Sequence, residues 1–290
     1  MRSSPSCHSS RSGDFPLADS TVSARQEYVH GYSDRERARL ADQAGTLVDL
    51  LHSDTSYPSG SVVLEVGCGV GAQTVTLAKR SPEARIVSMD ISKDSLAAAR
   101  ESARSAGSRN VMFQQADVYA MAFAPDAFDH VFACFVLEHL TRPREALQRF
   151  SEVLKPGGTI TVIEGDHGST YFHPESPHAR QAIRCLIELQ ARAGGDSLIG
   201  RRLYPLLLEA GFRDVTVSPR MVYVDSSRPQ LVEGFTKNTF TAMVEGVRGR
   251  ALAAGLIDEA TWEKGIRDLY RTAEADGTFC YTFFKAVANR

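Results

Sequence analysis

Short apolar runs rich in β-branched residues alternate with helical patterns along residues 61–165, and this alternation constrains the fold more than any other feature. Each run has the length of one strand and few polar positions, as expected for strands covered on both faces. The strand patterns are SVVLEVG, ARIVSMD, NVMFQQAD, FDHVFACFVL and GGTITVIEG, and the helical patterns are VGAQTVTLAKR, SKDSLAAARESARSAG and residues 143–154. The sequence therefore predicts an α/β fold built on a doubly wound, mostly parallel sheet.

The remainder of the chain predicts a tail, a lid and a substrate-covering region around this core. Residues 1–26 are rich in Ser and Arg and predict a mobile N-terminal tail, and residues 27–57 contain an amphipathic helix that would form a lid. The core then occupies residues 58–165. Residues 166–290 predict substrate-covering helices and the last two strands of the sheet, which a long helical insertion separates.

The charge of the chain is nearly balanced, with 33 basic against 35 acidic residues and a formal net charge of −2. This balance argues against nucleic acid or an anionic membrane as partner, and it fits a small hydrophobic substrate better. No apolar run approaches the ~18 residues that a spanning helix needs, and the polar first residues do not resemble a secretory signal, so we expect a cytoplasmic protein. The five cysteines form no CxxC pair, which argues against disulfides and thiolate zinc sites.

A glycine-rich turn, VLEVGCGVG, leads from the first predicted strand into the first helix. Glycine suits this place because the chain turns tightly and a ligand can approach the bare backbone. Gly67, Gly69 and Ala72 also satisfy the dinucleotide pattern G-x-G-x-x-G/A, and Asp90 at the end of the second strand fits either kind of adenine nucleoside. The turn alone therefore leaves a nicotinamide dehydrogenase open as an alternative.

Three further features distinguish the two possibilities. Glu65 precedes the first glycine by two residues, Asp117 follows the third strand in QQADV, and the segment LKPGG introduces the fifth strand. This set resembles the class I S-adenosylmethionine-dependent methyltransferases, over about residues 34–165 and the terminal strand. The resemblance implies a Rossmann-like sheet of seven strands, with the last strand antiparallel at the edge, and S-adenosylmethionine as cofactor.

The resemblance also implies roles for individual residues. Glu65 and the glycine loop would hold the methionyl end of the cofactor, Asp90 the ribose hydroxyls and Asp117 the adenine amino group. Other residues would form the walls of the adenine slot and the edge that faces the acceptor. The predicted cofactor-binding residues are Tyr32, Glu65, Gly67, Gly69, Asp90, Ile91, Asp117, Val118 and Phe135.

The methyl acceptor decides whether a general base is needed. Oxygen and nitrogen acceptors lose a proton, and His139 and His167 are the histidines that follow the fourth and fifth strands. The predicted catalytic residues are His167, His139 and Tyr32. A metal held by Asp166, His167, His173 and His178 is a further possibility, but their spacing matches no familiar ligand pattern, so we expect no metal.

A carbon acceptor needs a different environment, because methylation of an alkene leaves a carbocation that aromatic faces stabilise. Aromatic side chains outside the strand patterns supply candidates for such a pocket. Together with His167 they give the predicted substrate-binding residues, which are Tyr28, Phe135, His167, Tyr171, Phe172, Tyr204 and Phe235. Tyr28 and Tyr32 bracket Gly31 like a lid on a hinge, and this N-terminal segment could instead reach a second subunit in a homo-oligomer.

The segments YVHGYSDRERARL, GDHGSTYFHPE and GTFCYTFFK, together with the helical insertion, resemble the teleocidin-type C-methyltransferases of natural-product biosynthesis. This resemblance implies methyl transfer to the geranyl side chain of an indole alkaloid, followed by ring closure. The alternatives are O- or N-methylation of a quinone or polyketide with His167 as base, a nicotinamide dehydrogenase, and a cofactor-binding module without catalysis.

Overall fold

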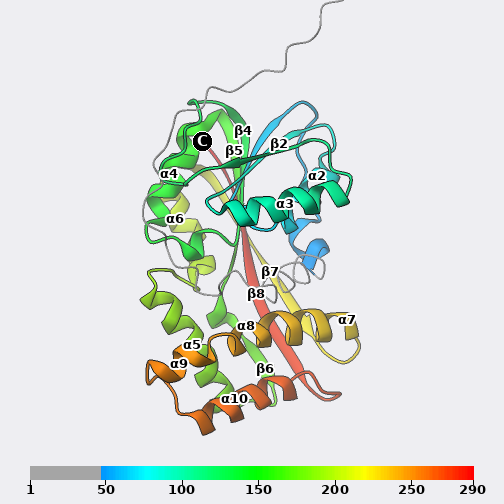
Figure 1. Cartoon of the computed structure of the whole chain (residues 1–290), viewed down its shortest axis with the longest axis vertical. Helices are drawn as coiled ribbons and strands as arrows, with labels where there is room; N and C mark the ends of the chain where they lie inside the picture. The colour runs from blue at the N-terminus through cyan, green and yellow to red at the C-terminus, as the bar shows by residue number, and fades with distance from the viewer. Residues whose placement is uncertain (1–46) are drawn as a thin grey trace, which may run out of the picture.

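The computed structural model describes residues 47–290, which form an eight-stranded sheet with helices on both of its faces (Figure 1). The strand order is β3-β2-β1-β4-β5-β8-β6, with β7 paired to β8 in addition. The strands are β1 (Val62–Val66), β2 (Arg85–Asp90), β3 (Val111–Gln115), β4 (Phe128–Cys134), β5 (Leu154–Gly165), β6 (Tyr171–His173), β7 (Arg213–Val224) and β8 (Thr278–Asn289). The predicted Rossmann-like α/β fold is confirmed.

The first five strands are parallel and follow the sequence patterns closely. Their neighbours pair as β1 with β2, β1 with β4, β2 with β3 and β4 with β5. The connecting helices are α2 (Ala72–Arg80), α3 (Lys93–Ser105) and α4 (Pro143–Val153). Because the strands are parallel, their carboxyl ends lie at one edge of the sheet, which is where open α/β sheets bind ligands.

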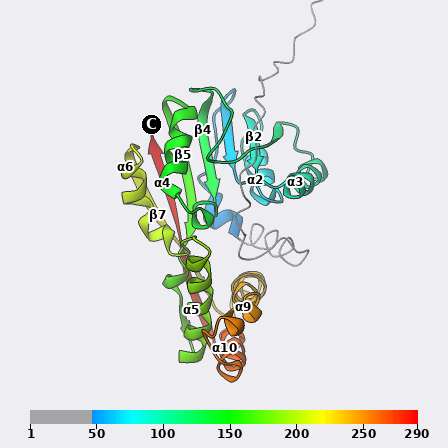
Figure 2. The ribbon, with the colours of Figure 1, turned by 60° about the vertical axis from the view of Figure 1, so that its left-hand side comes forward.

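Helices α2 and α3 lie on one face of the sheet and α4 lies on the other (Figure 2), and each face carries its own apolar layer. Helix α2 contributes Leu77 to one layer, which also contains Val63 and Ile86 from the sheet. Helix α4 contributes Phe150 to the other layer, together with Leu207 of α6 (Leu203–Glu209). Burial of both faces explains why the predicted strands contain so few polar residues.

Strand β8 runs antiparallel to β5 and extends well beyond it. Residues 283–289 of β8 pair with β5, residues 278–280 pair with β6, and β7 accompanies β8 along its other edge. Figure 1 shows β7 and β8 leaving the core as a long ribbon that reaches a second group of helices. The seven strands expected are therefore joined by β6, a short strand that the sequence patterns do not predict.

The helices on this ribbon come from two regions of the sequence. Helix α5 precedes β7, and the others form the insertion between β7 and β8. They are α5 (Pro177–Arg192), α7 (Pro229–Leu231), the π-helix η4 (Val232–Thr241), α8 (Ala242–Glu245), α9 (Arg248–Ala253) and α10 (Glu259–Arg271). Helices α5 and α10 lie side by side. Ser176 caps α5 by accepting a hydrogen bond from the N–H of Ala179, and its Oγ donates a hydrogen bond to Oδ2 of Asp268 on α10 at 2.5 Å.

None of the helices in residues 47–290 is long and apolar enough to cross a membrane. The predicted tail, most of the predicted lid, and Tyr28 and Tyr32 with it, lie outside the described residues.

Candidate active site

The glycine turn after β1 leaves one stretch of backbone open. Gly67, Gly69 and Gly71 all have positive φ values, of 65°, 52° and 83°, which favour glycine. A Cβ at Gly67 would lie 2.7 Å from Cγ2 of Val136, and a Cβ at Gly71 would lie 2.9 Å from Cα of Ala99. A Cβ at Gly69 would meet nothing within 4 Å. Gly67 and Gly71 are thus required by packing, whereas Gly69 presents bare backbone to an open space.

Asp90 at the end of β2 holds this turn in place. Its Oδ2 accepts a hydrogen bond from the N–H of Gly69 at 2.9 Å, and its Oδ1 accepts one from the N–H of Ser92 at 2.9 Å. Burial raises the pKa of Asp90, while these hydrogen bonds act in the opposite direction. Each carboxylate oxygen has a second lone pair. Asp90 can therefore still accept hydrogen bonds from the hydroxyl groups of a ligand beside Gly69.

The end of β3 lies next to the end of β2, since Asp90 pairs with Gln115. Asp117 follows this strand, and its Oδ1 accepts a hydrogen bond from the N–H of Tyr119 at 2.9 Å. The amide of Gln115 donates to the carbonyl of Ile91 at 2.9 Å, and the Ile91 side chain is 40% exposed. The predicted ribose and adenine residues therefore follow neighbouring strand ends, with an exposed apolar side chain beside Asp90.

Glu65 is buried beneath the turn, where its Oε2 accepts hydrogen bonds from Thr74 and Ser88, both at 2.6 Å. Its Oε1 has no hydrogen-bond partner among the described residues. Burial raises the pKa of Glu65 to about 7. Glu65 therefore ties β1 to β2 and α2, and it has one acceptor atom left.

Phe135 follows β4 and has a φ of 57°, a conformation that non-glycine residues seldom adopt and that clusters at functional sites. Its ring lies 5.5 Å from that of Phe283. From there, buried rings continue along β8 from Phe283 to Tyr281, with a centroid separation of 4.7 Å, and then to Phe240 on the π-helix η4, at 5.5 Å from Tyr281. We call this set the aromatic cluster; its members are Phe135, Phe172, Phe235, Phe240, Phe279, Tyr281 and Phe283.

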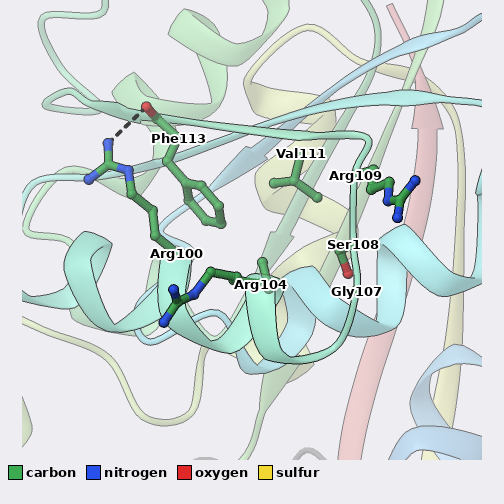
Figure 3. A pocket seen from close by; sticks show the side chains of 8 residues that line it. Arg100, Arg104, Gly107, Ser108, Arg109, Val111 and Phe113 are labelled. Carbon is green, nitrogen blue, oxygen red and sulfur yellow. Dashed lines mark hydrogen bonds between the residues drawn. The ribbon is translucent and has the colours of Figure 1, made fainter.

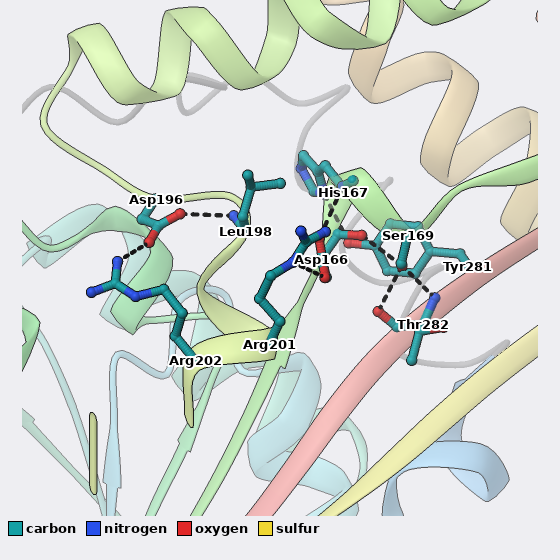
Figure 4. A network of polar contacts seen from close by, with 10 residues as sticks. Asp166, His167, Ser169, Asp196, Leu198, Arg201, Arg202, Tyr281 and Thr282 are labelled. Carbon is teal, nitrogen blue, oxygen red and sulfur yellow. Dashed lines mark hydrogen bonds and ion pairs between the residues drawn. The ribbon is translucent and has the colours of Figure 1, made fainter. Parts of the chain in front are cut away.

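His167 lies against this cluster, and its Nδ1 is hydrogen-bonded to Oη of Tyr281 at 2.8 Å (Figure 4). The neighbouring Asp166 accepts two hydrogen bonds from Arg201, at 2.6 and 2.7 Å. Burial raises the pKa of Tyr281 well above its ordinary value, so its hydroxyl is neutral.

The remaining predicted residues are only partly brought together. Phe172 and Phe235 belong to the aromatic cluster, whereas Tyr171 is 68% exposed and Tyr204 on α6 is 52% exposed. Tyr171 and Phe172 separate because they are consecutive in strand β6, where alternate side chains point to opposite faces. Nε2 of His139 lies 3.5 Å from Oε1 of Glu138.

Two further buried residues lie at this end of the sheet and were not predicted from the sequence. Tyr281 is the partner of His167, and Glu164 at the end of β5 accepts two backbone hydrogen bonds from the turn that follows Phe135. Glu164 directly precedes the segment GDHGSTYFHPE, and its charge within an otherwise apolar strand pattern is a signal that could have identified it. No pattern within the sequence pairs Tyr281 with His167.

Two hollows on the surface of the described residues are lined by none of the predicted site residues. The hollow in Figure 3, of about 390 Å³, lies between the end of α3 and the outer strand β3. A second, of about 310 Å³, lies in the loop from Tyr119 to Pro125. Within residues 47–290 no three His, Cys, Asp or Glu side chains form a group that could hold a metal ion.

A doubly wound sheet with an open glycine turn and acidic residues at neighbouring strand ends defines an adenine-nucleoside-binding α/β protein. A model of the methyltransferase domain family matches residues 58–210, more than half of the chain. The chain therefore belongs to the methyltransferase domain family. This assignment decides against the dehydrogenase alternative.

Individual relatives agree with the family. The O-methyltransferase cnsE of Penicillium expansum is 31% identical over 205 residues, covering 69% of this chain and 71% of cnsE. An uncharacterised 37.1 kDa protein in transposon TN4556 of Streptomyces fradiae is 32% identical over 190 residues, covering 64% of this chain and 54% of that protein. The cyclase SpnF shares the fold, with a TM-score of 0.52 and 20% identity, covering 86% of this chain and 80% of SpnF. The chain spans about half or less of several curated relatives it matches.

The residues present fit the cofactor S-adenosylmethionine. Gly69 leaves room where a Cβ would stand, Asp90 and Asp117 retain acceptor capacity, and Oε1 of Glu65 is an unused acceptor under the turn. We call the space beside Gly69, Asp90 and Asp117 the cofactor crevice.

Proposed function

We propose that this enzyme transfers a methyl group to a carbon of the geranyl side chain of an indole alkaloid in secondary metabolism. The observation that carries the proposal is the aromatic cluster, which starts at Phe135 beside the cofactor crevice and continues along β8. The aromatic cluster suits a hydrophobic small molecule as the partner. The nearly balanced charge of the chain agrees with such a partner.

Binding and orientation are the main tasks of the protein in this reaction. When bound, S-adenosylmethionine supplies an electrophilic methyl group. Gly69, Asp90 and Asp117 would hold the nucleoside, and Phe135 would separate it from the acceptor. Holding the reacting atoms in line near contact can lower the barrier by ~7 to 11 kcal/mol.

The aromatic cluster would serve the second half of the reaction. Methylation of an alkene leaves a positive charge on the substrate carbon chain, and a cation over an aromatic face gains about 2 kcal/mol or more when it is desolvated. The rings of Tyr281, Phe283 and Phe240 are at most 2% exposed, so water has little access to this wall. Exclusion of water would let a carbon of the indole ring attack the cation and close a ring instead of the cation being hydrated. The attacking indole carbon would then lose its proton to solvent, which restores the neutral aromatic ring.

A second candidate is O-methylation of a quinone or polyketide, and two observations favour it. His167 is buried at the aromatic cluster and hydrogen-bonded to Tyr281, so a titratable group lies where an acceptor would bind. The relative cnsE is described as an O-methyltransferase. In this case His167 would take the proton that the acceptor hydroxyl loses.

Incubation with S-adenosylmethionine labelled with ¹³C in the methyl group distinguishes the two candidates. Geranylated indole alkaloids and hydroxyquinones would be offered in parallel, with Asp94→Ala as a surface control for Asp90→Ala. The proposal expects a labelled methyl bonded to carbon in the alkaloid product by NMR, absent with the Asp90 variant. A labelled methyl bonded to oxygen would instead establish the second candidate.

A further inference from the structure

Glu164 is a fully buried acid at the carboxyl end of β5, and its carboxyl group faces the turn that follows β4. Its Oε1 accepts hydrogen bonds from the N–H of Val136 at 3.0 Å and from the N–H of Leu137 at 2.7 Å. These two N–H groups lie just past the end of β4, where the sheet no longer supplies acceptors. Without Glu164, both donors would be buried and unsatisfied, which costs free energy.

The turn that Glu164 holds is in direct contact with the glycine turn. Val136 packs so closely against Gly67 that a Cβ there would lie 2.7 Å from Cγ2 of Val136. The residue before it, Phe135, has the strained φ of 57°, and its own N–H donates to the carbonyl of Ile163 at 2.9 Å. Strained conformations of this kind persist only where the surroundings fix them.

We infer that Glu164 is a positioning residue of the cofactor crevice, which holds Phe135 and Val136 against the glycine turn through the N–H groups of Val136 and Leu137. The inference rests on the proposed location of the crevice beside Gly69. Glu164 is fully buried and acts only through the turn. Its role is distinct from those of Asp90 and Asp117.

The chemical state of Glu164 suits this role. Burial, and then the nearby carboxylate of Glu138, raise the pKa of Glu164 well above its ordinary value, so the side chain is a neutral acid. Its Oε2 has no hydrogen-bond partner among the described residues. The contribution of Glu164 is therefore an accepting oxygen, which glutamine can also supply at the same position and without a charge.

Two variants of the full chain separate the accepting oxygen from the bulk of the side chain. Glu164→Gln keeps the oxygen, and Glu164→Met keeps the length but has no acceptor for the two N–H groups. Lys285→Met serves as a control, because it also removes a buried polar side chain but from contacts with Asp54 and Thr55. Asp90→Ala reports on the crevice itself. Titration calorimetry with S-adenosylhomocysteine and denaturation midpoints would be measured for each variant.

We expect Glu164→Gln to bind S-adenosylhomocysteine within about threefold of the wild type. Glu164→Met should bind about tenfold more weakly or worse, since it leaves two buried N–H donors without an acceptor and the loss of one such hydrogen bond already has this size. Lys285→Met should bind S-adenosylhomocysteine with wild-type affinity, although its loss of stability should be comparable to that of Glu164→Met. Wild-type affinity in Glu164→Met would overturn the inference. If Asp90→Ala also bound normally, the proposed crevice itself would be wrong.

Amide exchange in the wild-type protein gives a test that needs no variant. The amides of Val136 and Leu137 should be protected from exchange. S-adenosylhomocysteine should slow their exchange further, because a ligand bound in the cofactor crevice would stabilise the neighbouring turn. Should Glu164→Met fail to fold, this measurement decides. Exchange at these two amides that is unaffected by saturating S-adenosylhomocysteine would contradict the inference.

Discussion

Nδ1 of His167 lies 2.8 Å from Oη of Tyr281, although 114 positions separate the two residues in the sequence. Both side chains are buried, and both rings contact Phe240 of the π-helix, with centroids 6.1 Å and 5.5 Å away. The pair therefore places one titratable ring and one neutral hydroxyl beside an otherwise apolar wall. Its importance depends on whether the reaction releases a proton when the methyl group is transferred.

The variant His167→Asn tests that point, because asparagine can still bond to Tyr281 but cannot take up a proton. No proton leaves when a methyl group is transferred to an alkene carbon, so we expect kcat of this variant to fall by less than about tenfold with such an acceptor. If His167 is the general base for an oxygen or nitrogen acceptor, its loss should lower kcat by about 10²- to 10⁴-fold. Steady-state kinetics with each class of acceptor would measure it. A loss at the upper end of that range, together with loss of the acid limb of the pH profile, would favour O- or N-methylation.

Glu65 predicts a specific dependence of stability on pH. Its pKa is about 7 in the folded protein because of burial, against an ordinary value of 4.5. Between these values the folded state keeps a proton that the unfolded state has released, so the free energy of unfolding falls as pH rises, by on the order of 3 kcal/mol for this group. Glu65→Gln should lack this decrease in denaturant titrations at pH 4.5 and pH 7. Parallel curves for the variant and the wild type would show that Glu65 has an ordinary pKa.

Lys285 anchors the segment before β1 to the sheet. It is only 3% exposed, and its Nζ donates to Oδ1 of Asp54 and to Oγ1 of Thr55, both at 2.6 Å. Because Asp54 is itself about half exposed, solvent screens part of this ion pair, and we expect Lys285→Met to lower the free energy of unfolding by about 1 to 3 kcal/mol. Lys237→Met removes a surface pair with Glu233 and should change it by less than ~0.5 kcal/mol.

Gly69 and Gly60 form a matched pair for testing the open backbone. Both have positive φ, 52° and 77°, and a Cβ at either would meet nothing within 4 Å. Alanine at either position should therefore cost about 1 to 2 kcal/mol of stability through backbone strain alone. Only Gly69→Ala should also weaken binding of S-adenosylhomocysteine, because its methyl group would enter the cofactor crevice. Equal affinities for the two variants would place the cofactor elsewhere.

The parallel core was predictable because each of its elements has a local signature. The strands β1 to β5 contain apolar runs rich in β-branched residues, and the helices between them have amphipathic patterns. Helix α3 also follows the cap residue Ser92, whose Oγ accepts from the N–H of Ser95. The strand ends that carry Asp90 and Asp117 follow from the same pattern, since parallel strands bring their carboxyl ends to one edge. The positions of Asp90 and Asp117 at neighbouring strand ends could thus be predicted without the structure, and their contacts with the cofactor stay a prediction.

The aromatic cluster was harder to predict from the sequence, because its contacts join segments that are distant in the chain. Strand β8 reads clearly as a strand, but nothing in its sequence shows that it bridges β5 and β6 on one edge and β7 on the other. The segment with Tyr171 and Phe172 reads as a polar loop, yet it forms strand β6, so only one of these two neighbouring rings is buried. Tyr281 and Glu164 look like ordinary strand residues until the fold brings their partners to them.

Calorimetric titration of Asp90→Ala with S-adenosylhomocysteine, beside the exposed control Asp94→Ala, tests the central claim most directly. Loss of a charged acceptor to buried hydroxyls should weaken binding by ~1.5 to 3 kcal/mol in the Asp90 variant and leave the Asp94 variant unchanged. Undiminished affinity in Asp90→Ala would contradict the placement of the cofactor at the ends of β1, β2 and β3.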